Sequence, residues 1–157
     1  MTAARLSLLS FVLVLFFGTA CKTFVVKNVN YAQQVESVLT PDEQGEVKDT
    51  RYGVAFNILP FQFQELNDSS SVMVDKVRLI RNSKGFYFIT ADGFSSVYVM
   101  EPIKSGLKLK EKIEVSEEGL ISPAFNLRTP YIELVDTETS QVFTLNEKGI
   151  YNQENAS

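Results

Sequence analysis

The sequence predicts a mainly β protein, an antiparallel β-barrel or sandwich built from hairpins and meanders. From Arg51 onward, short runs rich in Val, Ile, Phe and Tyr alternate with turn-forming residues. Asp92 and Gly93 lie between two such runs, where both residues tolerate the positive φ angles of a tight hairpin. Residues 107–115 (LKLKEKIEV) alternate apolar and polar side chains, as a half-buried strand does. We therefore expect about eight to ten strands.

The segment before Arg51 is less regular. Residues 22–30 (KTFVVKNVN) are expected to form an extended tether, or else a first strand. Residues 31–39 fit two structures, because their apolar side chains share one helical face while residues 34–39 also have the pattern of a short strand. Helix and strand both stay open for this segment.

Turn-forming residues separate the expected strands from one another. Leu59-Pro60 interrupts an aromatic run, residues 67–71 (NDSSS) form a loop, and Pro102 is expected to end a strand. Pro123 has no N–H to donate, so its strand is expected to lie at an edge or to contain a bulge. The expected strands are residues 52–57, 61–65, 72–81, 86–91, 94–100, 107–115, 120–127, 131–136, 140–145 and 149–151.

A weak internal repeat adds a minority alternative. Residues 131–145 (YIELVDTETSQVFTL) resemble the inner hairpin of a β-propeller repeat, and residues 87–92 match residues 131–136 at an offset of roughly 44 residues. Only two copies fit, whereas closed propellers have about four or more blades. A propeller-like pair of blades is therefore the minority prediction, and two hairpins with similar turns are preferred.

Residues 1–20 have the three parts of an export signal. Arg5 supplies positive charge, residues 6–17 (LSLLSFVLVLFF) form an apolar stretch, and residues 18–20 (GTA) are small and directly precede Cys21. The apolar stretch is shorter than the ~20 residues that a membrane-spanning helix needs. We therefore expect this segment to be a signal peptide that is removed.

Residues 18–20 and Cys21 together resemble the lipobox of bacterial lipoproteins. The resemblance implies that diacylglycerol is attached to the sulfur of Cys21, and that cleavage between Ala20 and Cys21 exposes an amine for further acylation. Gly18 departs from the family pattern, which usually has an aliphatic residue there, and residues 18–20 also suit an ordinary secretory signal. Cys21 is the only cysteine, so it has no disulfide partner within the chain, which favours lipidation over plain secretion.

The same resemblance implies a location and a division of the chain. Lipoproteins with Asp directly after the cysteine stay at the inner membrane in the enterobacterial pattern; Lys22 in that place favours the outer membrane. The expected parts are a signal peptide (1–20), a lipidated cysteine with a tether (21–33), a β-rich domain (34–152) and a frayed tail (153–157).

The composition restricts the chemistry that is open to the chain. It contains no histidine, so triads that use a histidine base are excluded. With one cysteine and no histidine, a zinc or haem site is not expected, and no glycine-rich phosphate loop is present. The net charge of −4 argues against a nucleic acid partner. We expect no cofactor, no metal site and no enzymatic activity.

Lys108, Lys110 and Lys112 are the first group of candidate partner contacts. The alternation of residues 107–115 places all three on one face of a strand. The functional interpretation is a patch for lipid head groups or for an acidic partner. The preferred interpretation is an ordinary solvated face, whose lysines protect the strand from edge pairing.

Phe56, Phe61 and Phe63 are the second group, within the run FNILPFQF. The functional interpretation is a groove for a hydrophobic ligand or a partner strand, and the preferred one is packing in the core.

These observations favour a lipid-anchored protein of the bacterial cell envelope, which acts without catalysis as a partner-binding or scaffolding module. An envelope protein is the expected partner. One alternative is a β-barrel carrier or inhibitor that holds an apolar ligand or an enzyme loop, and a carboxylate-dependent hydrolase is the least favoured. A cavity lined by Phe and Tyr would favour the carrier, and an exposed apolar patch or strand edge would favour partner binding.

We predict that replacement Cys21→Ser abolishes anchoring, because each buried CH₂ of an acyl chain contributes ~0.8 kcal/mol to membrane binding and two chains hold a protein firmly. Detergent-phase partitioning and intact-mass measurement of wild type and variant decide the matter. A wild-type protein that begins at Cys21 with an unmodified mass would contradict the prediction.

Overall fold

The computed structural model describes residues 35–104 and 106–151. All of these residues belong to one unit of the chain, residues 32–157. The expected signal peptide, Cys21, the tether and the tail at 153–157 lie outside the described residues, so the fold described below is that of the β-rich domain alone.

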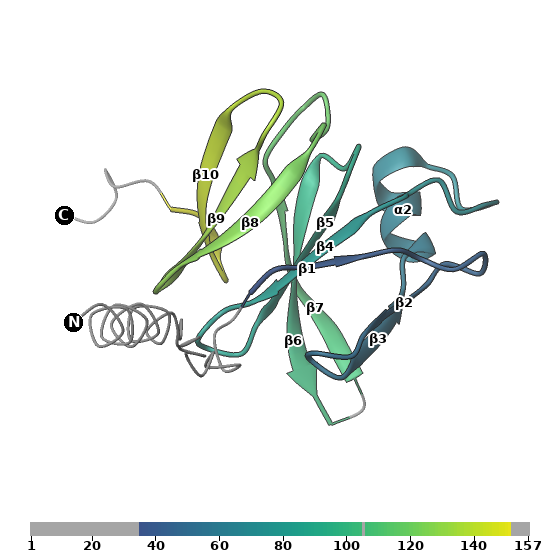
Figure 1. The fold of residues 1–157 in the computed structure, drawn as a ribbon, viewed down its shortest axis with the longest axis horizontal. Helices are drawn as coiled ribbons and strands as arrows, with labels where there is room; N and C mark the ends of the chain where they lie inside the picture. The colour runs from purple at the N-terminus through teal and green to yellow at the C-terminus, as the bar shows by residue number, and fades with distance from the viewer. Residues whose placement is uncertain (1–34, 105, 152–157) are drawn as a thin grey trace, which may run out of the picture. The chain divides into compact units, whose positions relative to one another are not determined.

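The domain is mainly antiparallel β, as the sequence predicts. One sheet has five strands in the order β1-β4-β5-β6-β7, a second has four in the order β11-β10-β9-β8, and β2 and β3 pair separately. Neither larger sheet closes on itself, and the two pack face to face like a β-sandwich rather than a barrel (Figure 1). The elements are β1 (Ser37–Leu39), β2 (Glu46–Asp49), β3 (Val54–Asn57), α2 (Leu59–Leu66), β4 (Val77–Arg81), β5 (Tyr87–Ala91), β6 (Ser96–Ile103), β7 (Gly106–Glu114), β8 (Pro123–Arg128), β9 (Tyr131–Asp136), β10 (Gln141–Asn146) and β11 (Gly149–Ile150).

The five-stranded sheet is buried on both faces at its centre. Every residue of β5 is buried. Tyr87, Ile89 and Ala91 point into one hydrophobic cluster, while Phe88 between them points into the other. A strand covered on both faces has no polar side, which is why the sequence of β5 (YFITA) lacks charged residues.

The first core lies between the central sheet and a cover made of α2 and the β2–β3 hairpin. Val47 of β2 and Ile58, just before α2, are fully buried there. From the central sheet, the side chains in this cluster are Val77, Leu79, Tyr87, Ile89, Ala91, Tyr98 and Met100.

The second core lies on the opposite face of the same sheet. Its other cover is the four-stranded sheet, which contributes Phe125, Ile132, Leu134 and Leu145. Along each central strand, neighbouring residues alternate between the two cores, so one strand helps to stabilise both covers.

Residues 61–65 form part of helix α2, so the strand expected there is wrong. The side chain of Asn57 accepts the N–H of Leu59 at 2.8 Å, and Pro60 lies in the first turn, where its missing N–H costs nothing. The helix ends at Asn67, whose left-handed φ of 55° is a common way to stop a helix. The alternating run FQF imitates a strand, but the signals on either side of it specify a helix.

Other strand boundaries also differ from the expected ones. The strand expected at 72–81 begins only at Val77, and β6 continues through Pro102 to Ile103. Strand β5 pairs with β6 no further than Met100, so β6 is an edge strand beyond that point and tolerates a proline. Pro123 is the first residue of β8, which is an edge strand as expected.

A β-bulge interrupts the alternation that the sequence predicts in residues 107–115. Val99 pairs with Glu111, but the next residue of β6, Met100, pairs with Leu109, so Lys110 is an extra residue on β7. Leu109 therefore lies on the face of the first core, and Ile113 packs in the second core. The expectation that apolar residues of this strand share one face is wrong.

The ambiguous segment 31–39 contributes strand β1 at Ser37–Leu39, and residues 31–34 lie outside the described residues. The two matching segments of the weak repeat are β5 and β9, and they lie in different sheets. Each is an inner strand of its sheet and the first strand of a hairpin, β5 with β6 and β9 with β10.

Gln62 is fully buried and holds the loop after α2 by its side chain. Its amide nitrogen donates to the carbonyl oxygens of Asp68 and Ser71 at 2.9 and 2.8 Å, and its oxygen accepts the N–H of Met73 at 2.8 Å. One side chain thus satisfies three backbone groups of a loop that has no strand partner.

We predict that Gln62→Met lowers the free energy of unfolding by about 2–4 kcal/mol, because three backbone groups lose their partner while the volume is kept. Urea unfolding at neutral pH measures the change. The matched control is Gln64→Met on the exposed face of the same helix, which should change the stability by less than ~0.5 kcal/mol. Equal effects of the two substitutions would contradict the role of Gln62.

Candidate functional site

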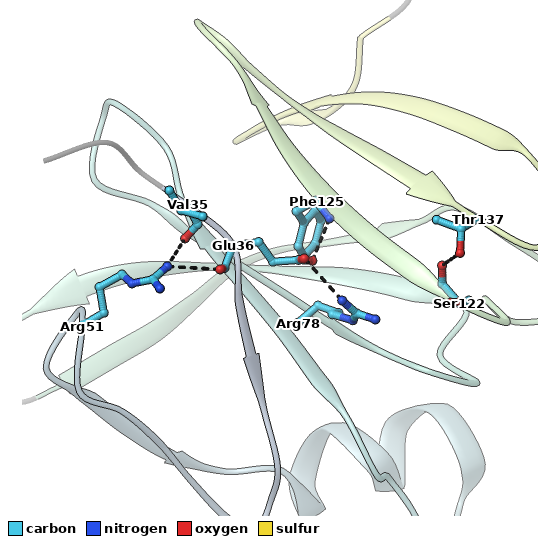
Figure 2. A network of polar contacts seen from close by, with 7 residues as sticks. All are labelled: Val35, Glu36, Arg51, Arg78, Ser122, Phe125 and Thr137. Carbon is cyan, nitrogen blue, oxygen red and sulfur yellow. Dashed lines mark hydrogen bonds and ion pairs between the residues drawn. The ribbon is translucent and has the colours of Figure 1, made fainter. Parts of the chain in front are cut away.

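Glu36 lies where the chain enters the described domain, and it joins the two sheets. Its carboxylate accepts the backbone N–H of Phe125 in β8 at 2.7 Å and forms an ion pair with Arg78 of β4 at 3.3 Å (Figure 2). Both ionic side chains are only 15% exposed. The carboxylate therefore bridges the central sheet and the edge of the four-stranded sheet.

The backbone around Glu36 is fixed as well. The guanidinium of Arg51 donates to the carbonyl oxygens of Val35 and Glu36, both at 3.1 Å (Figure 2). The hydroxyl of Tyr52 donates to the carbonyl of Val35 at 2.8 Å. Asp49 accepts the N–H groups of Arg51 and Tyr52 and so shapes the turn that presents both side chains. We call Val35, Glu36, Arg51 and Arg78 the Glu36 clamp.

The geometry of β8 explains why a carboxylate is needed there. Among the described strands, β8 pairs only with β9, so the N–H of Phe125 points away from the sheet and requires another acceptor. Burial raises the pKa of Glu36 above its ordinary value, although the Phe125 N–H and Arg78 act in the opposite direction. The clamp fixes Val35 and Glu36, the first described residues, to the rest of the domain.

A second buried carboxylate, Glu65 of α2, joins the helix to the central sheet. The hydroxyl of Tyr98 donates to Glu65 Oε1 at 2.5 Å, and Lys112 Nζ lies 2.9 Å from the same oxygen. The N–H of Ser95 donates to Oε2 at 2.7 Å. Lys112 also lies over the ring of Tyr98, 5.5 Å from its centroid.

These contacts determine the protonation of the cluster. Burial acts to raise the pKa of Glu65, but the hydrogen bonds from Tyr98, Lys112 and Ser95 outweigh it, and the pKa lies below its ordinary value. Burial and the neighbouring carboxylate raise the pKa of Tyr98. A carboxylate whose lone pairs are engaged by three donors is well suited to a structural tie.

The structure does not place the three candidate lysines on one face. Lys112 pairs with Tyr98 on the face of the first core, whereas Lys108 pairs with Glu101 on the opposite face. Lys110 is the bulge residue, and its Nζ lies 4.9 Å from the centroid of Phe86, which packs on the second core. The bulge divides the lysines, so they do not form one patch.

The three candidate phenylalanines also divide. Phe56 and Phe61 pack against the first core, and Phe61 makes an edge-to-face contact with Tyr98 at 4.8 Å between centroids. The preferred core interpretation fits both of them. Phe63 instead lies on the outer side of α2, where it is exposed.

Phe63 belongs to an exposed apolar surface that we call the α2 patch, formed by Phe63, Leu66 and Met73. Their exposed fractions are 52, 39 and 56%. Phe63 and Leu66 are neighbours on the helix surface at the spacing i, i+3, and Gln62 holds Met73 against the same helix. A surface hollow of about 360 Å³ lies beside them, lined by Asn57, Leu59, Pro60, Phe63 and Ser69.

Helix α2 contributes no exposed charged side chain to the α2 patch. Glu65 is the only charged residue of α2 (LPFQFQEL), and its side chain is 1% exposed. The sequence interpretation missed Leu66 and Met73, because it assigned residues 61–65 to a strand. The i, i+3 spacing of Phe63 and Leu66 becomes informative only once the segment is recognised as a helix.

Within residues 35–104 and 106–151, no group of three or more acidic side chains is arranged to hold a metal ion. No helix in this part of the chain is long and apolar enough to cross a membrane. Comparisons with family models, curated proteins and solved structures gave no match.

We predict that Glu65→Gln lowers stability by about 1–3 kcal/mol at neutral pH, because the charged contacts with Lys112 and Tyr98 weaken. The pKa of Glu65 is lower in the folded than in the unfolded protein, so its contribution is present above the ordinary value of 4.5 and is lost as pH falls through the folded pKa. The difference between wild type and variant should therefore shrink between pH 7 and pH 3 (about the range for carboxylates).

Thermal unfolding across this pH range measures both curves. Glu46→Gln is the control, because Glu46 forms an exposed ion pair with Lys48 and should affect stability little. A Glu65 difference that stays constant down to pH 3 (roughly the lower end of carboxylate titration) would count against the assignment.

Proposed function

We propose that this chain is a lipid-anchored lipoprotein of the bacterial cell envelope that binds a protein partner without catalysis. Residues 18–20 and Cys21 support the anchor, and Lys22 supports delivery to the outer membrane. The single observation that supports partner binding is the α2 patch. Two of its exposed apolar side chains lie on α2 and the third lies on the loop that follows, while the one charged side chain of the helix, Glu65, is buried. An exposed apolar surface of this kind is typical of an interaction site.

The segments that carry the α2 patch are fixed to the domain by buried polar contacts, which favours a binding role for its exposed apolar side chains. Gln62 fixes the loop that carries Met73, and Glu65 fixes the helix to the central sheet. Both anchors use buried polar atoms, so the apolar side chains are presented on a rigid base. A rigid surface loses little conformational entropy when a partner binds.

The Glu36 clamp supports a scaffolding role for the same module. It attaches the segment that follows the proposed tether to β4, β8 and the turn at Arg51. Because the first residues of the domain are fixed in this way, its binding surfaces keep a constant position and orientation relative to them.

The carrier remains the second candidate, because one hollow combines aromatic and aliphatic walls. It has a volume of about 300 Å³, and Tyr52 and Tyr87 form its aromatic walls. Its other lining residues are Gly53, Val54, Ala55, Pro102, Ile103, Gly106 and Leu107. This volume is at the lower limit of small-molecule sites, which supports a short apolar ligand at most.

We predict that the α2 patch contacts the partner in intact cells. A photo-reactive phenylalanine analogue in place of Gln64, which is exposed beside the patch, should give a discrete crosslinked product. Phe63→Ser with Leu66→Ser should remove that product, because the apolar contact is lost, while the protein remains folded and anchored.

Two controls make the result specific. Ile103→Ser with Leu109→Ser makes the same change at exposed apolar residues of β6 and β7, and the product should persist. The analogue placed at Asn126, exposed on β8, should not give the same product. A product that persists in the α2 patch variant and disappears in the β6–β7 variant would favour the carrier hollow instead.

A further inference from the structure

Strand β10 has an edge that the described residues only partly cover. β9 pairs with β10 along Gln141–Leu145 on one side. On the other side, β11 pairs only with Leu145 and Asn146, and one further bond runs from the N–H of Tyr151 to the carbonyl of Thr144. The described part of the chain therefore provides no strand opposite the first half of β10.

The bond from Tyr151 identifies which backbone groups face outward. Within a strand, the N–H and C=O of one residue point to the same side, and every second residue repeats that direction. Thr144 faces β11, so Val142 presents its N–H and C=O on the same side, at the uncovered part of the edge. The side chain of Val142 is 57% exposed.

A groove lies beside this edge. It has a volume of about 470 Å³, between β10 and the segment that links β7 to β8. Its lining residues are Val115, Ser116, Glu117, Glu118, Gly119, Ile121, Thr139, Gln141 and Phe143. Val115 and Phe143 pack partly on the second core and form an apolar floor.

The rim of the groove is negatively charged. Glu117 and Glu118 are both exposed, and none of the described residues that line the groove is basic. Ile121, also in the lining, is 61% exposed. The site thus combines an unpaired strand edge, apolar side chains and two carboxylates, which together suit an extended segment that carries basic residues.

We infer that the β10 groove binds an extended, basic segment of a protein partner by strand addition. The segment pairs with the N–H and C=O of Val142 and extends the four-stranded sheet. Its alternate side chains lie against Phe143 and Val115 on one face, and its Lys or Arg residues meet Glu117 and Glu118. This site is separate from the α2 patch and is the second contact surface of the domain.

Charge also argues against two other occupants. A second copy of the chain would bring its own Glu117 and Glu118 to a symmetric contact, where like charges repel. Residues 152–157 (NQENAS) contain Glu154 and no basic residue, so they do not complement the rim either.

The test uses the detergent-solubilised full chain and three fluorescein-labelled peptides with blocked ends. The basic probe is KVTVTVK, its acidic counterpart is EVTVTVE, and KVTPTVK has a proline that removes a central N–H. Fluorescence anisotropy should show saturable binding of the basic probe, at least about tenfold tighter than either of the others. Raising the NaCl concentration to about 0.5 M should weaken the binding, since salt screens the rim charges.

Two variants locate the site. Val142→Pro removes the outward N–H at an edge, where proline is tolerated, and should weaken binding of the basic probe about tenfold. Glu117→Lys with Glu118→Lys should weaken the basic probe and strengthen the acidic one. Glu43→Lys with Asp75→Lys makes the same change of charge at exposed residues outside the groove and should leave binding unchanged.

The outcomes separate the possible occupants. If the basic probe fails to bind, or if it binds the charge-reversed variant equally well, the inference is wrong. If binding requires deletion of residues 152–157, or if the chain dimerises and Val142→Pro abolishes the dimer, the edge has a different occupant and the inference is wrong too. Phe63→Ser with Leu66→Ser should not affect the probe, so failure here is distinguishable from failure of the α2 patch.

Discussion

The burial of the central sheet on both faces is the constraint on which the rest of the domain depends. Since all five residues of β5 are buried, neither face of this sheet can be left to water. α2 with the β2–β3 hairpin covers one face, and the four-stranded sheet covers the other (Figure 1). Apolar packing alone leaves the orientation of each cover loosely specified, and a buried carboxylate fixes each one. Glu65 ties α2 to β6 and β7, and Glu36 ties β8 to the central sheet.

The two carboxylates respond to acid in opposite directions. The pKa of Glu36 is raised, so its contribution to stability is complete below the ordinary value of 4.5 and is lost as pH rises through its folded pKa. The pKa of Glu65 is lowered, so its contribution is complete above the ordinary value and is lost as pH falls. Acid therefore weakens the attachment of the cover that carries the α2 patch, whereas the contribution of Glu36 at β8 is largest in acid. At neutral pH the charge of Glu65 stabilises the domain. The charge of the buried Glu36 costs stability at that pH, and its contacts with Arg78 and Phe125 offset part of the cost.

Local patterns in the sequence predicted most strands, but they did not predict helix α2, the β-bulge in β7 or the contacts of the buried carboxylates. The runs of Val, Ile, Phe and Tyr are sufficient for antiparallel β structure, because strand formation depends on side chains a few residues apart. Helix α2 was missed because FQF alternates like a strand, although Asn57 and Pro60 are helix-start residues. The bulge at Lys110 arises from pairing with β6 and has no local signal, so the sequence could not separate the lysines. Glu36 and Glu65 depend on partners 89 and 33 residues away along the chain, and no pattern within one segment reveals such pairs.

The two proposed contact surfaces belong to different covers of the central sheet. The α2 patch lies on the helical cover, and the β10 groove lies on the four-stranded one. Their chemistry differs as well: one is apolar and uncharged, and the other is a strand edge with an acidic rim. Two unlike surfaces on opposite covers suit two different partners, or two separate regions of one partner. As proposed, the two surfaces would hold their partners in a fixed relation, because the central sheet between them packs against both covers.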